Sequence, residues 1–197
     1  AGTAEVLTAI TSLATYGSPT VNAPLLIEGY TSTAGDGGIG DFNGNAGNFS
    51  ILPNTQFVAV RNMKLRNTGT ATIVSWSSVN WNWFDNVEFN TCTNTVVVNL
   101  GSGCRAVNCS WTGFTTSSQL LCTCSGDADV IHCWFESNGG LCCINIADAD
   151  GSVVYGNIIN CAGVTLGVRC NSVRGNIVKH NSILGSSCTG SGIRLVS

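Results

Sequence analysis

Short stretches in which apolar and polar residues alternate recur along most of the chain, from about residue 57 onward. Many of the apolar positions are β-branched or aromatic, and Gly, Thr, Ser and Asn separate the stretches. A period of two residues between turn-forming residues predicts β-strands. In each unit a second alternating stretch follows the first, and these second stretches are residues 72–76, 96–100, 121–124, 142–146, 164–168 and 193–195.

One phrase marks the repeat: an apolar residue, a second residue, an asparagine and then a new apolar alternation. Cys133 takes the place of the asparagine in one unit, and the asparagines of the other units are Asn62, Asn86, Asn108, Asn157 and Asn176. Successive marks are 24, 22, 25, 24 and 19 residues apart. Short strands in units of this length cannot bury their apolar faces alone, so the units stack on one another. The pattern predicts an all-β solenoid.

The Gly-Asn-apolar phrases at residues 156–158 and 175–177, with the recurring asparagine, carry a resemblance to a known superfamily. The chain resembles the right-handed parallel β-helices of the pectate-lyase-like superfamily, which includes polysaccharide lyases and phage tailspikes. The resemblance covers roughly residues 25–197 and implies about six to seven coils. It also implies an inward ladder of stacked side chains, which we assign to Asn62, Asn86, Asn108, Asn157 and Asn176. A fold of this kind does not fix an activity.

The two ends of the chain differ from the repeat. Apolar residues at helical spacing predict a short amphipathic helix within residues 4–15, so we divide the chain into a helix and lead-in at 1–24 and a parallel β-helix at 25–197. Residues 192–197 have the pattern of a core strand with no polar cap after it. Because a bare solenoid end exposes its edge and core, we expect that the natural chain continues or that another subunit covers this coil.

Composition limits the classes of function. Only 10% of the 197 residues are charged, and 8 Lys and Arg against 11 Asp and Glu give a net charge of −3. Such a chain lacks the clustered basic charge that nucleic-acid binding needs. No apolar run reaches the length of a membrane span. The 44% hydrophobic content favours a packed core over disorder.

The 11 cysteines are an odd number, and several lie inside apolar strand-like stretches, including Cys122, Cys124, Cys142 and Cys143. No Cys-X-X-Cys phrase is present, and the two histidines do not give zinc-ligand spacing. We interpret the cysteines as small, reduced core residues, with one or two disulfides as the alternative. Free thiols suit a protein that folds in a cytoplasm before its release, as phage components do.

Two acidic pairs are candidates for chemistry. Asp127 and Asp129 precede Asp148 and Asp150 by 21 residues, about one coil, and Arg169 follows a further coil later. Neighbouring parallel strands lie about 4.8 Å apart, so these carboxylates could share one patch. The five residues are the candidate catalytic set, and a calcium ion at Asp127 and Asp148 is the one candidate cofactor. The alternative is turn chemistry, with arginines that neutralise the carboxylates.

Aromatic residues give a second candidate site. Trp81 and Trp83 alternate with asparagines, and Arg194 lies one coil beyond Arg169. If the indole rings are exposed, they form a platform for the faces of sugars; if they are buried, they are stacked core residues. We assign Trp81, Trp83 and Arg194 as candidate ligand-binding residues.

The sequence therefore predicts a structural β-solenoid module of an extracellular or virion-surface assembly, such as that of a phage. Its expected partners are further copies or other assembly subunits at the C-terminal coil, together with a polysaccharide. The alternative is a polysaccharide lyase or glycoside hydrolase that uses the acidic patch. An enzyme requires the carboxylates to converge in one groove, whereas carboxylates that are each bound by a turn amide favour the structural function.

Overall fold

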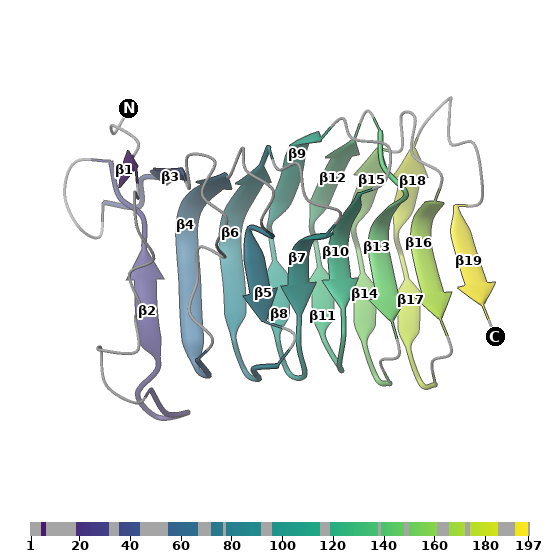
Figure 1. Cartoon of the computed structure of the whole chain (residues 1–197), viewed down its shortest axis with the longest axis horizontal. Helices are drawn as coiled ribbons and strands as arrows, with labels where there is room; N and C mark the ends of the chain where they lie inside the picture. The colour runs from purple at the N-terminus through teal and green to yellow at the C-terminus, as the bar shows by residue number, and fades with distance from the viewer. Residues whose placement is uncertain are drawn as a thin grey trace.

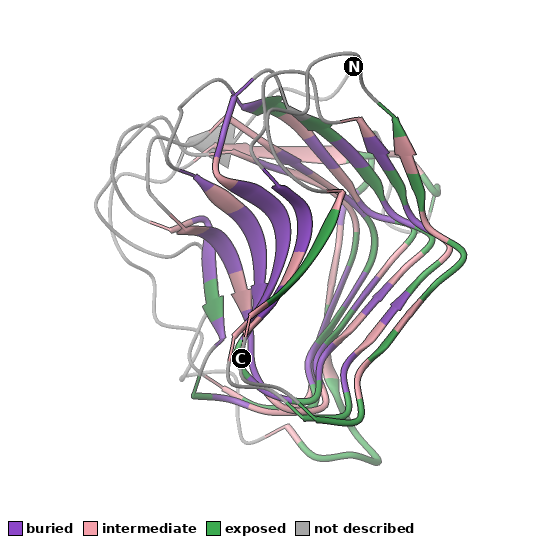
Figure 2. Cartoon of the chain, turned by 90° about the vertical axis from the view of Figure 1, so that its right-hand side faces the viewer, coloured by how far each residue is buried: buried purple, intermediate pink, exposed green. Residues whose placement is uncertain are grey.

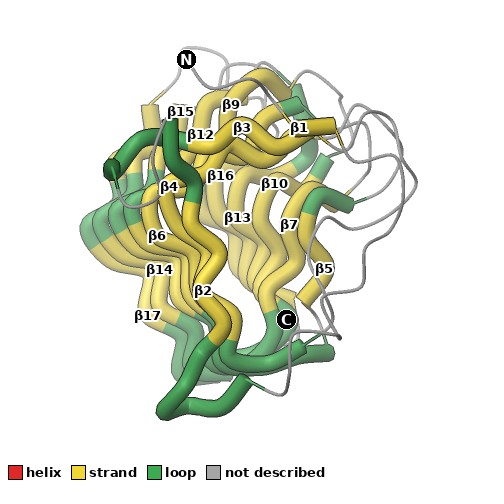
Figure 3. Tube along the Cα trace, turned by 90° about the vertical axis from the view of Figure 1, so that its left-hand side faces the viewer, coloured by secondary structure: helices red, strands yellow, loops and turns green. Residues whose placement is uncertain are grey.

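The computed structural model describes residues 5–6, 19–31, 36–43, 55–66, 72–76, 78–91, 96–114, 119–137, 139–147, 150–160, 166–171, 174–184 and 192–196. Within these ranges the chain forms β-strands and no helix (Figure 3). The strands stack side by side along the long axis of the molecule, from the N-terminal strands to the C-terminal ones (Figure 1). The expectation of an all-β parallel solenoid is confirmed, with about five turns instead of six to seven.

Two parallel sheets make up the solenoid. The larger, 13-stranded sheet contains β1 (Glu5–Val6), β2 (Leu25–Glu28), β3 (Gly40–Asn43), β4 (Val58–Arg66), β6 (Trp83–Asn90), β8 (Arg105–Val107), β9 (Ser110–Phe114), β11 (Asp129–Ile131), β12 (Trp134–Ser137), β14 (Val153–Tyr155), β15 (Ile158–Asn160), β17 (Ile177–Lys179) and β18 (Ser182–Leu184). The smaller, six-stranded sheet contains β5 (Val74–Trp76), β7 (Val96–Leu100), β10 (Leu120–Cys124), β13 (Cys142–Ala147), β16 (Leu166–Asn171) and β19 (Ile193–Val196).

Each strand pairs with the strand one turn away in the sequence. Phe84 pairs with Val60, 24 residues earlier, and Asn90 is hydrogen-bonded to Thr112 across 22 residues. Seen along the axis, β8, β11, β14 and β17 form one wall, β9, β12, β15 and β18 a second, and the smaller sheet the third (Figure 2). β4 and β6 each run across the corner between the first two walls, pairing with strands of both.

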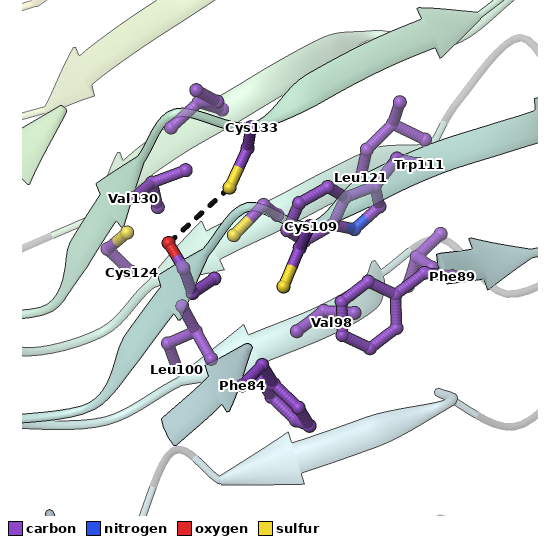
Figure 4. Close-up of a cluster of buried hydrophobic side chains, with 14 of the residues drawn as sticks. Phe84, Phe89, Val98, Leu100, Cys109, Trp111, Leu121, Cys124, Val130 and Cys133 are labelled. Atoms are coloured by element: carbon purple, nitrogen blue, oxygen red, sulfur yellow. Dashed lines mark hydrogen bonds between the residues drawn. The ribbon is translucent and has the colours of Figure 1, made fainter. Parts of the chain in front are cut away.

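The interior holds a continuous stack of aromatic rings. Trp76 of the smaller sheet stacks on Phe84 with ring centroids 4.3 Å apart, and Phe84 meets Phe89 edge to face at 5.0 Å. Trp111 then lies 4.7 Å from Phe89 and 4.4 Å from Phe135. All five rings are buried, so the stack ties three walls and several turns into one core (Figure 4).

Two columns of residues in the left-handed backbone region bend each rung. The first corner contains Phe57, Trp81, Gly103, Gly151 and Gly175, and the second contains Asn62, Asn86, Asn108, His132, Gly156 and His180. Left-handed φ angles suit glycine and, next best, asparagine. At Gly156 an added Cβ would also lie 2.5 Å from the His132 ring.

The residue after each corner forms an inward ladder with the neighbouring rungs. After the first corner, Asn82 accepts a hydrogen bond from the Val58 amide (2.7 Å) and Asn176 accepts one from the Ser152 amide (2.7 Å). After the second corner, Asn157 accepts from the Cys133 amide (2.8 Å). Each side chain therefore satisfies a buried backbone N–H one rung away.

The five asparagines expected to form one ladder belong to three columns. Asn62, Asn86 and Asn108 occupy the second corner itself, where Asn86 donates to the Asn62 side-chain oxygen (2.9 Å). Asn157 lies in the inward ladder after the second corner, and Asn176 in the ladder after the first. A single column is therefore wrong, because asparagine suits both a left-handed corner and an inward amide position.

The expected N-terminal helix is described only at Glu5–Val6, which form strand β1 and pair in parallel with Phe42 and Asn43. The rest of residues 4–15 lies outside the described residues.

Eight cysteines of the described part are free and buried: Cys104, Cys109, Cys122, Cys124, Cys133, Cys142, Cys143 and Cys170. Burial raises the pKa of the Cys104 thiol, and burial together with a hydrogen bond from Cys133 raises that of Cys109 strongly. Cys133 donates to the backbone oxygens of Ala106 (3.4 Å) and Ile131 (3.2 Å) (Figure 4). These thiols act as small core residues, as expected from the sequence.

Replacing Asn157 should destabilise the fold by about 2–5 kcal/mol, because Asn157→Ala leaves two buried backbone groups, the Cys133 N–H and the Val130 carbonyl, without their partner. Asn86→Gly is the matched control, since Asn86 is exposed and glycine suits its left-handed backbone; it should cost less than about 1 kcal/mol. Urea unfolding of both variants measures the difference. Equal losses would contradict the ladder assignment.

The free energy of unfolding should fall above about pH 8.5, the ordinary thiol pKa. Unfolded thiols ionise there while buried ones stay protonated, so the unfolded state binds fewer protons and rising pH favours it. Unfolding by denaturant in reducing buffer from pH 7 to 10 measures the slope. Cys109→Ala should reduce the slope by up to about 1.4 kcal/mol per pH unit. An unchanged slope in this variant would show that Cys109 is not the source.

Candidate functional site

An open groove of about 850 Å³ lies on the outer face of β6, β8 and β11, beside the first corner. The side chains that give it its character are Trp81, Trp83, Asp85, Arg105, Asp127 and Asp129. Their position follows from the register, because Trp83, Arg105 and Asp129 are directly paired on three adjacent strands. Trp81 and Asp127 occupy the first-corner position two residues before Trp83 and Asp129.

Trp81 lies across the neighbouring rung. It is 55% exposed, and its backbone adopts a left-handed φ of 62°. Its indole ring packs against Gly103, where an added Cβ would lie 2.5 Å from the indole Cε3. Only glycine leaves room for the ring there. Trp83 is 37% exposed, so both rings present a face to the solvent.

The carboxylates of the groove have fixed partners. Asp127 Oδ1 accepts a hydrogen bond from the Gly103 amide (2.9 Å), and Asp129 Oδ2 pairs with Arg105 Nε (2.9 Å). Burial raises the pKa of Asp129, while Arg105 opposes that rise. These contacts orient the carboxylates as hydrogen-bond acceptors.

The candidate catalytic residues are not brought together. Asp127 and Asp129 share the groove, but Asp150 lies at a turn, where its Oδ1 accepts from the Arg174 amide (2.7 Å). Arg169 lies on β16 of the smaller sheet and donates from Nε to Asn171 (2.8 Å). Asp148 lies outside the described residues.

Arg194, the third candidate ligand-binding residue, also lies away from the groove. It is on β19 and pairs with Arg169. The tryptophans and Arg194 therefore belong to two separate surfaces.

Metal binding finds limited support. Among the described residues no group of three or more His, Cys, Asp and Glu side chains could hold a metal ion. The calcium site expected at Asp127 and Asp148 stays a prediction, since only the first of the pair is described. His132 and His180 lie in one corner column and both contact Tyr155, with ring centroids 5.7 and 5.3 Å apart.

Sequence reasoning missed Asp85, Gly103 and Arg105 as groove residues. The signal that locates them is the register of the first corner: Gly103 follows Trp81 by one turn, and Arg105 follows Trp83. The period measured at the asparagines did not show which residues shared this corner.

No helix in the described ranges is long and apolar enough to cross a membrane. Comparisons of the chain with protein-family models, with curated proteins and with solved structures found no match.

Proposed function

We propose that this chain is a structural β-solenoid module of an extracellular or virion-surface assembly, and that its groove binds a neutral glycan. The observation that carries the glycan contact is the exposure of Trp81 and Trp83 side by side with oriented carboxylates. Flat apolar rings fit the C–H faces of sugars, and carboxylate oxygens accept hydrogen bonds from hydroxyl groups.

The charge of the groove favours a neutral sugar over an acidic one. Its lining contains three carboxylates, from Asp85, Asp127 and Asp129, and one cation, Arg105, which is already paired with Asp129. The uncompensated negative charge repels uronates and sulfated sugars.

A binding function suits these carboxylates better than catalysis does. Asp127 and Asp150 are each bound by a turn amide, and Arg169 is on the other sheet from Asp129. A lyase needs its acidic and basic groups in one site, so the lyase or hydrolase is the second candidate function.

The assembly part of the proposal rests on the last described rung and on the thiols. Leu195 continues the inward row of Ile146 and Cys170 and is 78% exposed. A further rung, from the same chain or from another subunit, would bury it. The eight buried free thiols fit folding in a reducing compartment before release.

Trp81→Ala should weaken glycan binding at least about tenfold, which is about 1.4 kcal/mol, because it removes the exposed stacking face. Trp134→Ala is the matched control: Trp134 is similarly exposed (38%) but lies on a different wall. Calorimetric titration with neutral glucan, mannan, galactan and N-acetylglucosamine oligosaccharides measures the change. Gly103→Ala, which displaces the Trp81 ring, should weaken binding as well. If no oligosaccharide binds, or if Trp134→Ala loses as much affinity, the groove assignment is wrong.

The enzyme alternative has its own test. We expect neither new reducing ends nor unsaturated products when the protein is incubated with neutral or acidic polysaccharides, with or without calcium. Product formation that disappears in Asp127→Ala but persists in Asp150→Ala would establish the enzyme instead.

A further inference from the structure

Charge is distributed unevenly along the chain. All 11 acidic residues precede residue 151, and the 47 residues from there to the end contain Arg169, Arg174, Lys179 and Arg194 but no Asp or Glu. The C-terminal turns therefore have cationic side chains and no carboxylate side chain of their own.

The cations of the earlier turns are all paired. Arg61 pairs with Glu28 at 2.8 Å, and Lys64, Arg66 and Arg105 pair with Glu88, Asp41 and Asp129, each at 2.9 Å. Within the described ranges none of the four later cations has an ion pair. The nearest carboxylate to them in the sequence, Asp150, accepts a bond from the backbone amide of Arg174.

Two of these cations are forced together by the sheet register. Arg169 of β16 is directly opposite Arg194 of β19, and parallel neighbours lie about 4.8 Å apart. Like charges directly opposite each other destabilise a sheet. Asn171, two residues from Arg169, accepts a hydrogen bond from its Nε (2.8 Å) and so fixes the orientation of that guanidinium group. An external anion would remove the repulsion at this place.

We propose that Arg169 and Arg194 form a binding site for a tetrahedral oxyanion, a sulfate or phosphate group. The guanidinium group is a planar fork of N–H donors that matches such oxygens, and two neighbouring forks can bridge one doubly charged group. The site lies on the smaller sheet, away from the tryptophan groove, and so goes beyond the proposed glycan contact. The group is either a free ion or an ester on a saccharide.

The test is the thermal stability of the full chain as sulfate or phosphate replaces chloride at constant ionic strength. A ligand at 100 times its Kd stabilises by about 2.7 kcal/mol, so the melting temperature should rise with the oxyanion. Arg169→Gln and Arg194→Gln should each weaken the apparent affinity at least about tenfold. Lys179→Gln is the matched control, since Lys179 has no ion pair in the described part of the chain either but lies on the larger sheet, and it should respond like the wild type.

A second readout guards against variants that fold poorly. The arginine Nε–H signals of the wild type should shift on titration with inorganic sulfate, and those of Arg169 and Arg194 should shift most. Glucose 6-sulfate distinguishes the sources: equal or tighter binding favours a sulfated saccharide, whereas binding of the inorganic ion alone favours a free ion. Equal melting shifts in the wild type and both arginine variants, or no arginine shift, would overturn the proposal.

Discussion

The left-handed corners of each rung are the constraint on which the rest of the structure depends. A residue with positive φ opens the first wall and another, five positions later, closes it, as at Trp81 and Asn86 or Gly151 and Gly156. Because this interval is constant, equivalent residues of successive turns meet in register. The inward amides then pair with neighbouring rungs, and the aromatic rings stack through the core.

The same constraint positions the surface chemistry. Outward residues of one wall line up at every turn, so Trp83, Arg105 and Asp129 form a row without any loop to hold them. On the smaller sheet the register sets Arg169 against Arg194, where two like charges share a row. A solenoid thus makes a site from side chains that are far apart in the sequence, and it also makes repulsive contacts that an external ion can relieve.

The sequence was sufficient for the architecture, because alternation and a period near 24 residues survive in every unit. It was insufficient for the columns. The apparent steps of 25 and 19 residues arose because Cys133, Asn157 and Asn176 belong to ladders and not to the second corner. His132, Gly156 and His180 occupy that corner, with steps of 24 residues. The acidic residues show the same limit: a shared period brought Asp127 and Arg169 to mind together, but a period does not say which sheet a residue faces.

The most direct test of this account is a ¹⁵N-edited NOESY spectrum of the protein. Parallel stacking predicts cross-peaks that connect the backbone protons of Ile131 both to Val107, one turn before, and to Tyr155, one turn after. Cross-peaks that instead join strands neighbouring in the sequence, in the antiparallel pattern of hairpins, would contradict the stacked rungs and every site built on them.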